Sequence, residues 1–138
     1  MAEKGRGAYL NGKKIHVSNT KKLEWAFISH CIWSKMKYPM PGFIDDLIFK
    51  HKAQSFGIGS IVYNAMLLAA GELDGITFGH TTAHDVAAVK VIVEEAGGKA
   101  TDLFGKDQKY DRPIKGCILS NGLVHKDLLK LVKVHLKI

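Results

Sequence analysis

The pattern of apolar and polar positions is clearest at residues 81–98. This stretch has the composition of one mostly buried helix with a single carboxylate, Asp85, in its first turn. Gly97-Gly98 follows as a typical helix stop. The pattern leaves open whether Asp85 only stabilises the start of the helix or also takes part in chemistry.

A β-hairpin is predicted near the N-terminus, at residues 5–17. Short β-prone runs flank Asn11-Gly12, and Asn-Gly is the preferred central pair of a type I′ turn. A polar connector follows, after which residues 25–29 have the composition of a short buried strand.

Residues 30–40 carry no regular pattern, and the prolines near their end exclude a continuous helix. Pro41 is a suitable first residue for a helix that runs to about Lys52. Three large side chains in this region are interpreted as core or interface packing rather than as a binding site: Trp33, Met36 and Tyr38.

From residue 53 onward, strand and helix signals alternate. A short strand at 54–58 leads through a glycine-rich turn into an uncharged helix at 61–70, with Ser60 as its N-cap. Because this helix carries no charge, we expect it to be buried on nearly all sides. Gly71 ends it, and a strand at 73–78 follows.

The C-terminal part continues the alternation. A strand at 99–103 precedes a polar loop, and the apolar strand at 116–120 is of the kind buried in a parallel sheet. A last helix follows Asn121-Gly122. Its expected buried stripe is Val124, Leu128, Leu131, Val132 and Leu136, and its solvated face is Lys126, Lys130, Lys133 and Lys137. The alternation predicts an α/β layered domain.

Length and composition fit one globular domain, with 138 residues of which 46% are hydrophobic and 24% charged. The longest uncharged apolar run, residues 58–71, is too short to span a bilayer, and the N-terminus lacks the apolar core of a signal peptide. We therefore expect a cytoplasmic protein with no membrane contact. Cys31 and Cys117 match no metal spacing and are expected to be reduced, structural thiols.

The net charge of +7 does not by itself indicate a nucleic-acid-binding protein. Only Arg6 and Arg112 are arginines, and the lysines are spread along the chain. Nucleic-acid grooves instead combine clustered basic residues with stacking aromatic rings. The dispersed lysines favour solvated faces, so we expect no nucleic-acid partner.

Asp85 has two interpretations. Thr82-x-x-Asp85 is a capping-box pattern, in which the carboxylate reaches back to free backbone N–H groups. Alternatively Asp85 binds a metal, but a lone carboxylate cannot hold Mg²⁺, which needs further oxygen ligands. The residues alone therefore favour the cap.

Two weaker patterns lie nearby. His80 and His84 have the spacing of paired metal ligands, but no glutamate lies between them as in the H-E-x-x-H motif. The turn at residues 57–60 could cradle a phosphate on its N–H groups, or could serve only as a tight strand-to-helix connection. No nucleophile elbow supports a Ser/His/Asp triad.

Six segments of the chain resemble the inositol monophosphatase family and occur in that family's order. They span nearly the whole sequence: residues 2–12, Gly59-Ser60, residues 69–75, residues 85–88, residues 95–102 and residues 120–125. The resemblance implies an α/β domain with a mixed, largely parallel sheet of about five strands, flanked by helices on both faces and preceded by the N-terminal hairpin.

The resemblance also implies a function. Family members hydrolyse phosphate monoesters with Mg²⁺, which activates a water and stabilises the leaving oxygen. The position that matches Asp85 supplies one metal carboxylate. The turn that matches Gly59, Ser60 and Ile61 lies beside the sugar or polyol part of the substrate.

Three departures from the family pattern affect this expectation. His84 stands where the family usually has Trp, and Phe78 stands where inositol-cleaving members usually carry a Glu that binds substrate hydroxyls. The family's main metal motif, Asp-Pro-x-Asp-Gly-Thr, does not occur in the chain. Phe78 cannot accept such hydrogen bonds, so the resemblance does not indicate specificity for inositol, and Asp85 has no partner carboxylate with family support.

We therefore expect residues 1–138 to be one domain, equivalent to the C-terminal half of such a phosphatase. Residues 1–18 would form the junction with the missing N-terminal half. The expected partners are a small phosphate monoester (an inositol, sugar or nucleotide-derived phosphate), that missing half or a partner chain, and a second copy in a homodimer. The chain alone is expected to be inactive. The alternative is a non-catalytic module that binds a partner chain or a polyanion through its lysines.

Overall fold

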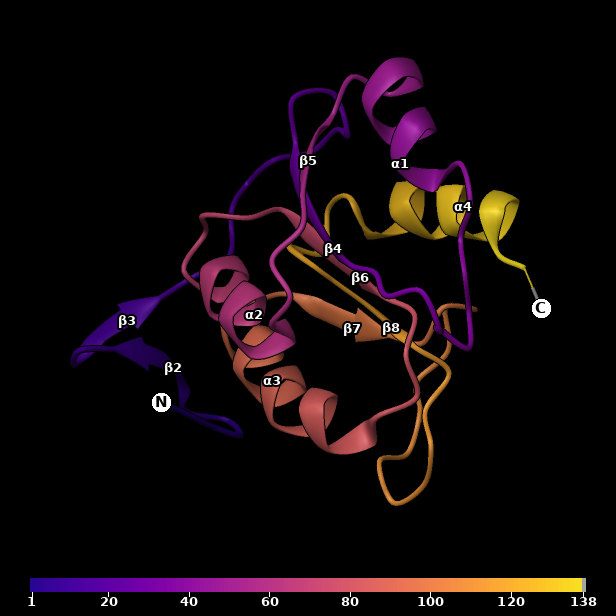
Figure 1. Cartoon of the computed structure of the whole chain (residues 1–138). Coiled ribbons are helices and arrows are strands. Elements are labelled where there is room, and N and C mark those ends of the chain that lie inside the picture. Colours follow the sequence, from indigo (N-terminus) through magenta and orange to yellow (C-terminus); the bar gives the residue numbers. More distant parts are fainter. Residues whose placement is uncertain (138) are drawn as a thin grey trace.

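The computed structural model describes residues 1–137, which form a small antiparallel sheet and a larger mixed sheet with helices on both faces (Figure 1). The strand order is β1-β2-β3 in the small sheet and β5-β4-β6-β8-β7 in the large one. The strands are β1 (Ala2–Glu3), β2 (Gly7–Leu10), β3 (Lys13–Ile15), β4 (Phe27–Cys31), β5 (Gln54–Phe56), β6 (Gly75–Phe78), β7 (Lys99–Thr101) and β8 (Cys117–Ser120). The helices are α1 (Phe43–Asp45), continued by the π-helical turn η1 (Asp46–Lys50), α2 (Ile61–Ala69), α3 (Ala83–Glu95) and α4 (His125–His135).

The predicted hairpin is confirmed. Strands β2 and β3 pair antiparallel, with Leu10 opposite Lys13. Between them, Asn11 and Gly12 both have positive φ angles, 51° and 77°, as a type I′ turn requires. The short strand β1 adds to the outer edge of β2, which the sequence pattern did not predict.

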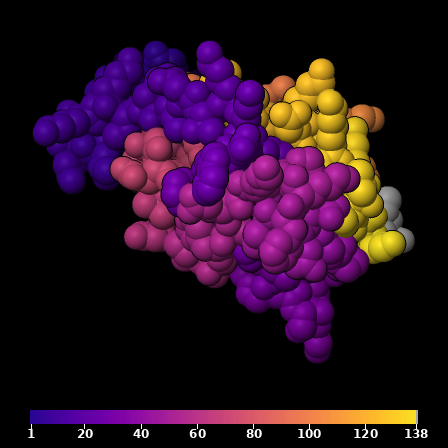
Figure 2. Space-filling model, turned by 90° about the horizontal axis from the view of Figure 1, so that it is seen from above, coloured from indigo at the N-terminus to yellow at the C-terminus, as the bar shows by residue number. Residues whose placement is uncertain are grey.

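The hairpin sheet is fastened to the end of α3. The Glu95 carboxylate accepts hydrogen bonds from the backbone N–H groups of Gly5 and Gly7, at 2.7 and 2.8 Å. The N–H of Val17 donates to the carbonyl oxygen of Ala96 at 2.9 Å. Figure 2 shows the N-terminal residues at one end of this face and the C-terminal helix at the opposite end.

The mixed sheet of five strands is confirmed, but its pairings are evenly divided. Strand β4 runs parallel to β5 and β6, whereas β8 runs antiparallel to both β6 and β7. The expectation that the strand at 116–120 has parallel neighbours is therefore wrong. The sheet is mixed as predicted, but half of its strand pairings are parallel, rather than most of them. A loop, rather than a helical crossover, joins β7 to β8, which permits the antiparallel arrangement.

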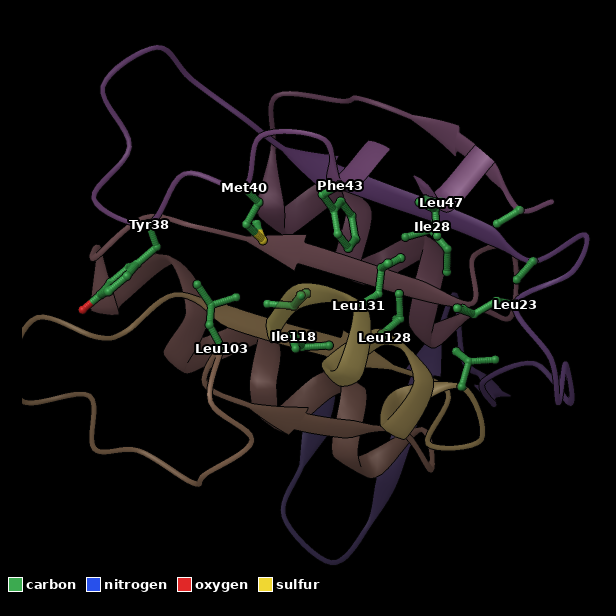
Figure 3. Close-up of a cluster of buried hydrophobic side chains, with 14 residues drawn as sticks. Leu23, Ile28, Tyr38, Met40, Phe43, Leu47, Leu103, Ile118, Leu128 and Leu131 are labelled. Atoms are coloured by element: carbon green, nitrogen blue, oxygen red, sulfur yellow. The ribbon is translucent and has the colours of Figure 1, made fainter. Parts of the chain in front are cut away.

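Helices cover both faces of this sheet, as predicted (Figure 1). On one face, α1, η1 and α4 enclose a core cluster that includes Ile28, Phe43, Leu47, Ile118, Leu128 and Leu131. In Figure 3 these side chains come together from the strands and from the helices that pack on this face. On the other face, α2 and α3 pack on a second cluster that includes Ile76, Phe78, Val89 and Leu119.

The three longest helices agree with the predicted positions but not always with the predicted burial. Along α4 the predicted apolar stripe is buried except for Leu136, which is half-buried, and the four lysines are exposed. Helix α2 was expected to be buried on nearly all sides, yet Val62 and Tyr63 are exposed. Helix α3 was expected to be mostly buried, but its outer face meets solvent and its buried residues are Val86, Val89 and Val93.

The first strand of the large sheet starts two residues later than predicted. Trp25 lies outside it with a φ angle of 65° and a largely exposed side chain. A buried carboxylate sets the strand's start, because Asp74 Oδ2 accepts the N–H of Phe27 at 2.7 Å. Asp74 Oδ1 also accepts the hydroxyl of Ser18 at 2.5 Å, which ties the connector after the hairpin to the starts of β4 and β6.

Both cysteines, Cys31 and Cys117, are buried and free, as predicted. Within residues 1–137, none of the helices combines the length and the apolar content needed to cross a membrane.

Candidate functional site

The carboxyl ends of the parallel strands β4, β5 and β6 lie at one edge of the large sheet (Figure 1). Three loops leave this edge, at residues 32–42, 57–60 and 79–82. Two of them lead directly into the N-termini of α2 and α3. In α/β proteins such an edge is the usual place for a ligand, and helix N-termini there favour anions. The edge also holds all of the predicted site residues.

The glycine-rich turn at 57–60 is held in place by hydrogen bonds with the buried side chain of Asn64 in α2. Its side-chain nitrogen donates to the carbonyl oxygen of Ile58 at 2.9 Å, and its side-chain oxygen accepts the hydroxyl of Ser29 at 3.0 Å. The Cys31 thiol also donates to the Ile58 carbonyl, at 3.6 Å. The Ser29–Asn64 bond is buried and the two bonds to Ile58 are partly buried, so the end of β4 and the first turns of α2 set the position of the turn.

The three turn residues predicted to bind substrate differ in exposure. Ser60 is the N-cap of α2, as predicted, and its hydroxyl accepts the N–H of Tyr63 at 3.2 Å. Gly59 faces open space, since an added Cβ would meet no atom within 4 Å. The Ile61 side chain is buried in the core. A ligand at this turn would therefore approach the Gly59 backbone and the Ser60 hydroxyl.

Phe78 ends strand β6 at the same edge, but its side chain is only 2% exposed. The rings of Trp33 and His80 cover it, with centroid distances of 6.0 and 6.1 Å. Trp33 and His80 also touch each other, at 5.9 Å. The predicted substrate contact of Phe78 is therefore indirect, because Trp33 and His80 lie between its ring and solvent.

Asp85 lies in the first turn of α3, as predicted, with a side chain that is 41% exposed. The predicted capping box does not form in the described part of the chain. The Thr82 hydroxyl makes no cap and instead bonds the ring nitrogen Nδ1 of His80 at 2.7 Å. The titratable neighbour of Asp85 is His84, whose Nε2 lies 3.5 Å from the carboxylate.

The described residues do not make a complete metal site. Among residues 1–137, no three side chains of His, Cys, Asp or Glu gather closely enough to hold an ion. Mg²⁺ requires about six oxygen ligands, of which Asp85 offers one carboxylate. His80 is held by Thr82, and His84 points to solvent beside Asp85.

Two titratable groups next to the turn have shifted pKa values. Burial lowers the pKa of His30, whose Nδ1 lies 3.0 Å from the Ser55 hydroxyl, so the ring is neutral at pH 7. Burial raises the pKa of the Cys31 thiol, with Asn64 acting weakly in the opposite direction. A protonated thiol is a poor nucleophile, so Cys31 does not suit covalent catalysis.

The sequence interpretation missed Asn64, His30 and the position of Trp33. One signal for Asn64 was available, because a side-chain amide in an uncharged helix needs a buried hydrogen-bond partner. The contacts of His30 and Trp33 join segments far apart in the chain and leave no local pattern.

The family model described as "Inositol monophosphatase family" matches residues 1–137. The chain belongs to the inositol monophosphatase family. The resemblance noted in the sequence is thus confirmed, and it extends over both sheets and all the loops at the candidate site.

Relatives within this family include phosphatases. The chain is 35% identical over 132 residues to the fructose-1,6-bisphosphatase/inositol-1-monophosphatase of Thermotoga maritima, covering 95% of this chain and 49% of the relative. It is 32% identical over 146 residues to the Nus factor SuhB of Pseudomonas aeruginosa, covering 98% and 51%. The chain therefore spans about half the length of the curated relatives it matches.

Solved structures agree with this placement in the inositol monophosphatase family. A Thermotoga maritima IMPase superimposes with a TM-score of 0.84 at 33% identity, covering 96% of this chain and 50% of that one. The extragenic suppressor protein suhB of Bartonella henselae gives a TM-score of 0.81 at 25% identity, with the same shares of the two chains. The fold of this chain is thus the fold of about half of an inositol monophosphatase-like molecule.

Proposed function

We propose that this chain is the C-terminal part of a Mg²⁺-dependent phosphatase that hydrolyses a small phosphate monoester. Family membership over residues 1–137 supports this proposal, as does the similarity to a Thermotoga maritima protein whose name includes two phosphatase activities. The coverage of about half of each relative supports the view that the working enzyme needs a second half.

The observation that carries the proposal is the position of Asp85. Its carboxylate is accessible, makes no capping bond, and lies at the start of α3 on the sheet edge that also presents the turn at 57–60. A carboxylate left free in this way is suited to be one ligand of a metal shared with another segment. When bound, the metal would supply charge stabilisation for the phosphate and lower the pKa of an attacking water.

The other proposed roles follow from exposure at the same edge. The Gly59 backbone and the Ser60 hydroxyl would face the alcohol part of the substrate, while Ile61 and Phe78 support that surface from the core. Phe78 offers no acceptor for a polyol hydroxyl. The proposal therefore favours a sugar or nucleotide-derived phosphate over inositol phosphate.

The remaining metal carboxylates would come from an N-terminal half or a partner chain. Residues 1–18 would lie at that junction, since their strands form a separate small sheet that Glu95 fastens to the end of α3. On this proposal the 138-residue chain alone does not turn over substrate.

The test joins the chain to the N-terminal half of the Thermotoga maritima relative. Phosphate release from a panel of monoesters is measured with and without Mg²⁺. We expect no turnover by the chain alone and Mg²⁺-dependent turnover by the fusion, which Asp85→Asn lowers by at least a hundredfold. Asp127→Asn, in the first turn of α4, is the matched control and leaves the rate unchanged.

Two results would overturn the proposal. One is steady turnover by the purified chain alone. The other is a fusion that folds and binds heparin in a salt-sensitive manner but shows no response to Mg²⁺, which would favour the non-catalytic module.

A further inference from the structure

An apolar hollow of about 410 Å³ lies next to the candidate site, between the loop after β4 and the start of α1. Its volume is within the range of small-ligand pockets. Apart from the carboxylate of Asp45, the side chains that form it are apolar. Those that matter here are Ile32, Trp33, Met36, Met40 and Ile44.

The Trp33 side chain lines this hollow and also contacts Phe78 and His80 at the candidate site. Its ring packs edge-on against Phe78 and His80, at 6.0 and 5.9 Å, yet the side chain is 44% exposed. The loop is fixed at its far end, where the N–H of Tyr38 donates to the carbonyl oxygen of Gly79 at 3.1 Å. The Trp33 ring is therefore held in place but still partly accessible. It is held by contacts with the loop at residues 79–82, which leads into the helix that carries Asp85.

We propose that this hollow binds a planar aromatic ring on the alcohol part of the substrate, so that the substrate is an aromatic phosphate ester such as a nucleotide. This inference rests on the proposed phosphatase function and names its substrate class. The phosphate would lie toward the start of α3, and the ring would stack against Trp33 in the hollow.

The chemistry of the lining distinguishes a ring from a polyol. A polyol placed there would leave its hydroxyls without partners, which costs binding free energy. An aromatic ring needs no such partners on its faces and gains from stacking on an indole. Met36 and Met40 are adaptable side chains that can follow a flat ligand. The exposed Asp45 carboxylate could accept a hydrogen bond from a ring amino group.

The test uses adenosine 5′-monophosphate and ribose 5-phosphate, which differ only by the base. The two tryptophans of the chain provide matched reporters. In Trp25→Phe only Trp33 remains, and in Trp33→Phe only the exposed Trp25 remains. We expect adenosine monophosphate to quench the fluorescence of Trp25→Phe saturably and to leave that of Trp33→Phe without a saturable change.

Affinity gives the second measurement, by calorimetry on the full chain. We expect adenosine monophosphate to bind at least tenfold more tightly than ribose 5-phosphate, and Trp33→Ala to remove that difference. Trp33→Phe keeps an aromatic ring at this position and retains part of the affinity difference. Ile32→Lys places a charge in the hollow and lowers the affinity for adenosine monophosphate but not for ribose 5-phosphate. Val134→Lys, at a more exposed apolar site on α4 outside the hollow, leaves the affinity for both ligands unchanged, and circular dichroism checks that each variant folds.

Equal affinity for the two ligands, or a base preference that survives both Trp33→Ala and Ile32→Lys, would overturn this inference. Its failure is distinguishable from that of the proposed function. Tighter binding of adenosine monophosphate than of ribose 5-phosphate, without turnover by the fused enzyme, would contradict the phosphatase proposal alone. Turnover with no preference for a ring would sink the aromatic-substrate inference alone.

Discussion

The side-chain amide of Asn64 donates a 2.9 Å hydrogen bond to the carbonyl oxygen of Ile58, linking helix α2 to the turn that precedes it. The same amide accepts the hydroxyl of Ser29 from strand β4 at 3.0 Å. Asn64 and Ser29 are fully buried. The open turn at the candidate site therefore keeps its shape through a polar contact inside the core.

Replacing Asn64 should destabilise the chain. In Asn64→Leu the buried Ser29 hydroxyl loses its partner, and the Ile58 carbonyl keeps only the weak Cys31 thiol donor. We therefore expect a loss of about 2–3 kcal/mol in the free energy of unfolding. Urea denaturation measures it. Ser60→Ala, which removes only an exposed helix cap, should cost about 1 kcal/mol. Equal losses in the two variants would contradict the buried role of Asn64.

Two glycines should respond differently to alanine. A Cβ at Gly98 would lie 2.5 Å from the carbonyl oxygen of Ser120 and 2.7 Å from a methyl of Val93. We expect Gly98→Ala to cost about 2 kcal/mol or more through overpacking. Gly59→Ala meets no neighbour and should change stability by less than about 0.5 kcal/mol. Thermal unfolding compares them, and a Gly59→Ala variant as unstable as Gly98→Ala would show that the turn is not open.

His125 should make stability depend on pH. Burial, with a smaller effect of the Lys99 charge, lowers the pKa of His125 to about 4. The ring is therefore neutral in the folded chain, and its two hydrogen bonds suit one neutral tautomer. The Ser120 hydroxyl accepts the N–H of Gly122 and donates to Nδ1 of the ring. The Thr101 hydroxyl donates to the Asp102 carbonyl and accepts the ring N–H at Nε2.

The unfolded chain takes up a proton near pH 6.5 and the folded chain does not, so stability is full above pH 6.5 and falls as the pH drops toward 4. The difference amounts to roughly 3 kcal/mol. Urea unfolding at pH 7 and pH 4.5 measures it. His125→Gln should lower stability at pH 7 and flatten this dependence, whereas His84→Gln, on the surface, should leave it unchanged. An unaltered slope in His125→Gln would rule out this origin.

Glu95 should hold the N-terminal hairpin in place. The N–H groups of Gly5 and Gly7 donate to its carboxylate and lower its pKa. The stabilisation is therefore present above the ordinary pKa of a glutamate and is lost as the pH falls through the lowered value.

We expect Glu95→Ala to speed amide hydrogen exchange at Gly5 and Gly7 and to expose Lys4 and Arg6 to trypsin, without changing exchange in the large sheet. Glu94→Ala, the neighbour on the same helix, is the control. Unchanged exchange in Glu95→Ala would mean that the hairpin is held by its other contacts, which include the hydrogen bond from Val17 to Ala96.

Much of the local structure could be predicted because it depends on neighbours in the sequence. The Asn11-Gly12 turn needs two positive φ angles, and Ser60 caps the helix that begins after it. The candidate site was harder to predict. Asp85 was placed correctly at the start of α3, but the predicted capping box was wrong, and the Thr82 hydroxyl bonds His80 instead of a backbone N–H.

The sequence by itself determined the order of helices and strands, the family, and the location of Gly59, Ser60 and Asp85 at helix starts. Only the tertiary structure decided that β8 runs antiparallel and that Trp33 and His80 cover Phe78. The physical reason is that a strand buried on both faces has the same apolar composition whatever its direction. Contacts between loops that leave different strands likewise depend on the assembled sheet, and no local pattern records them.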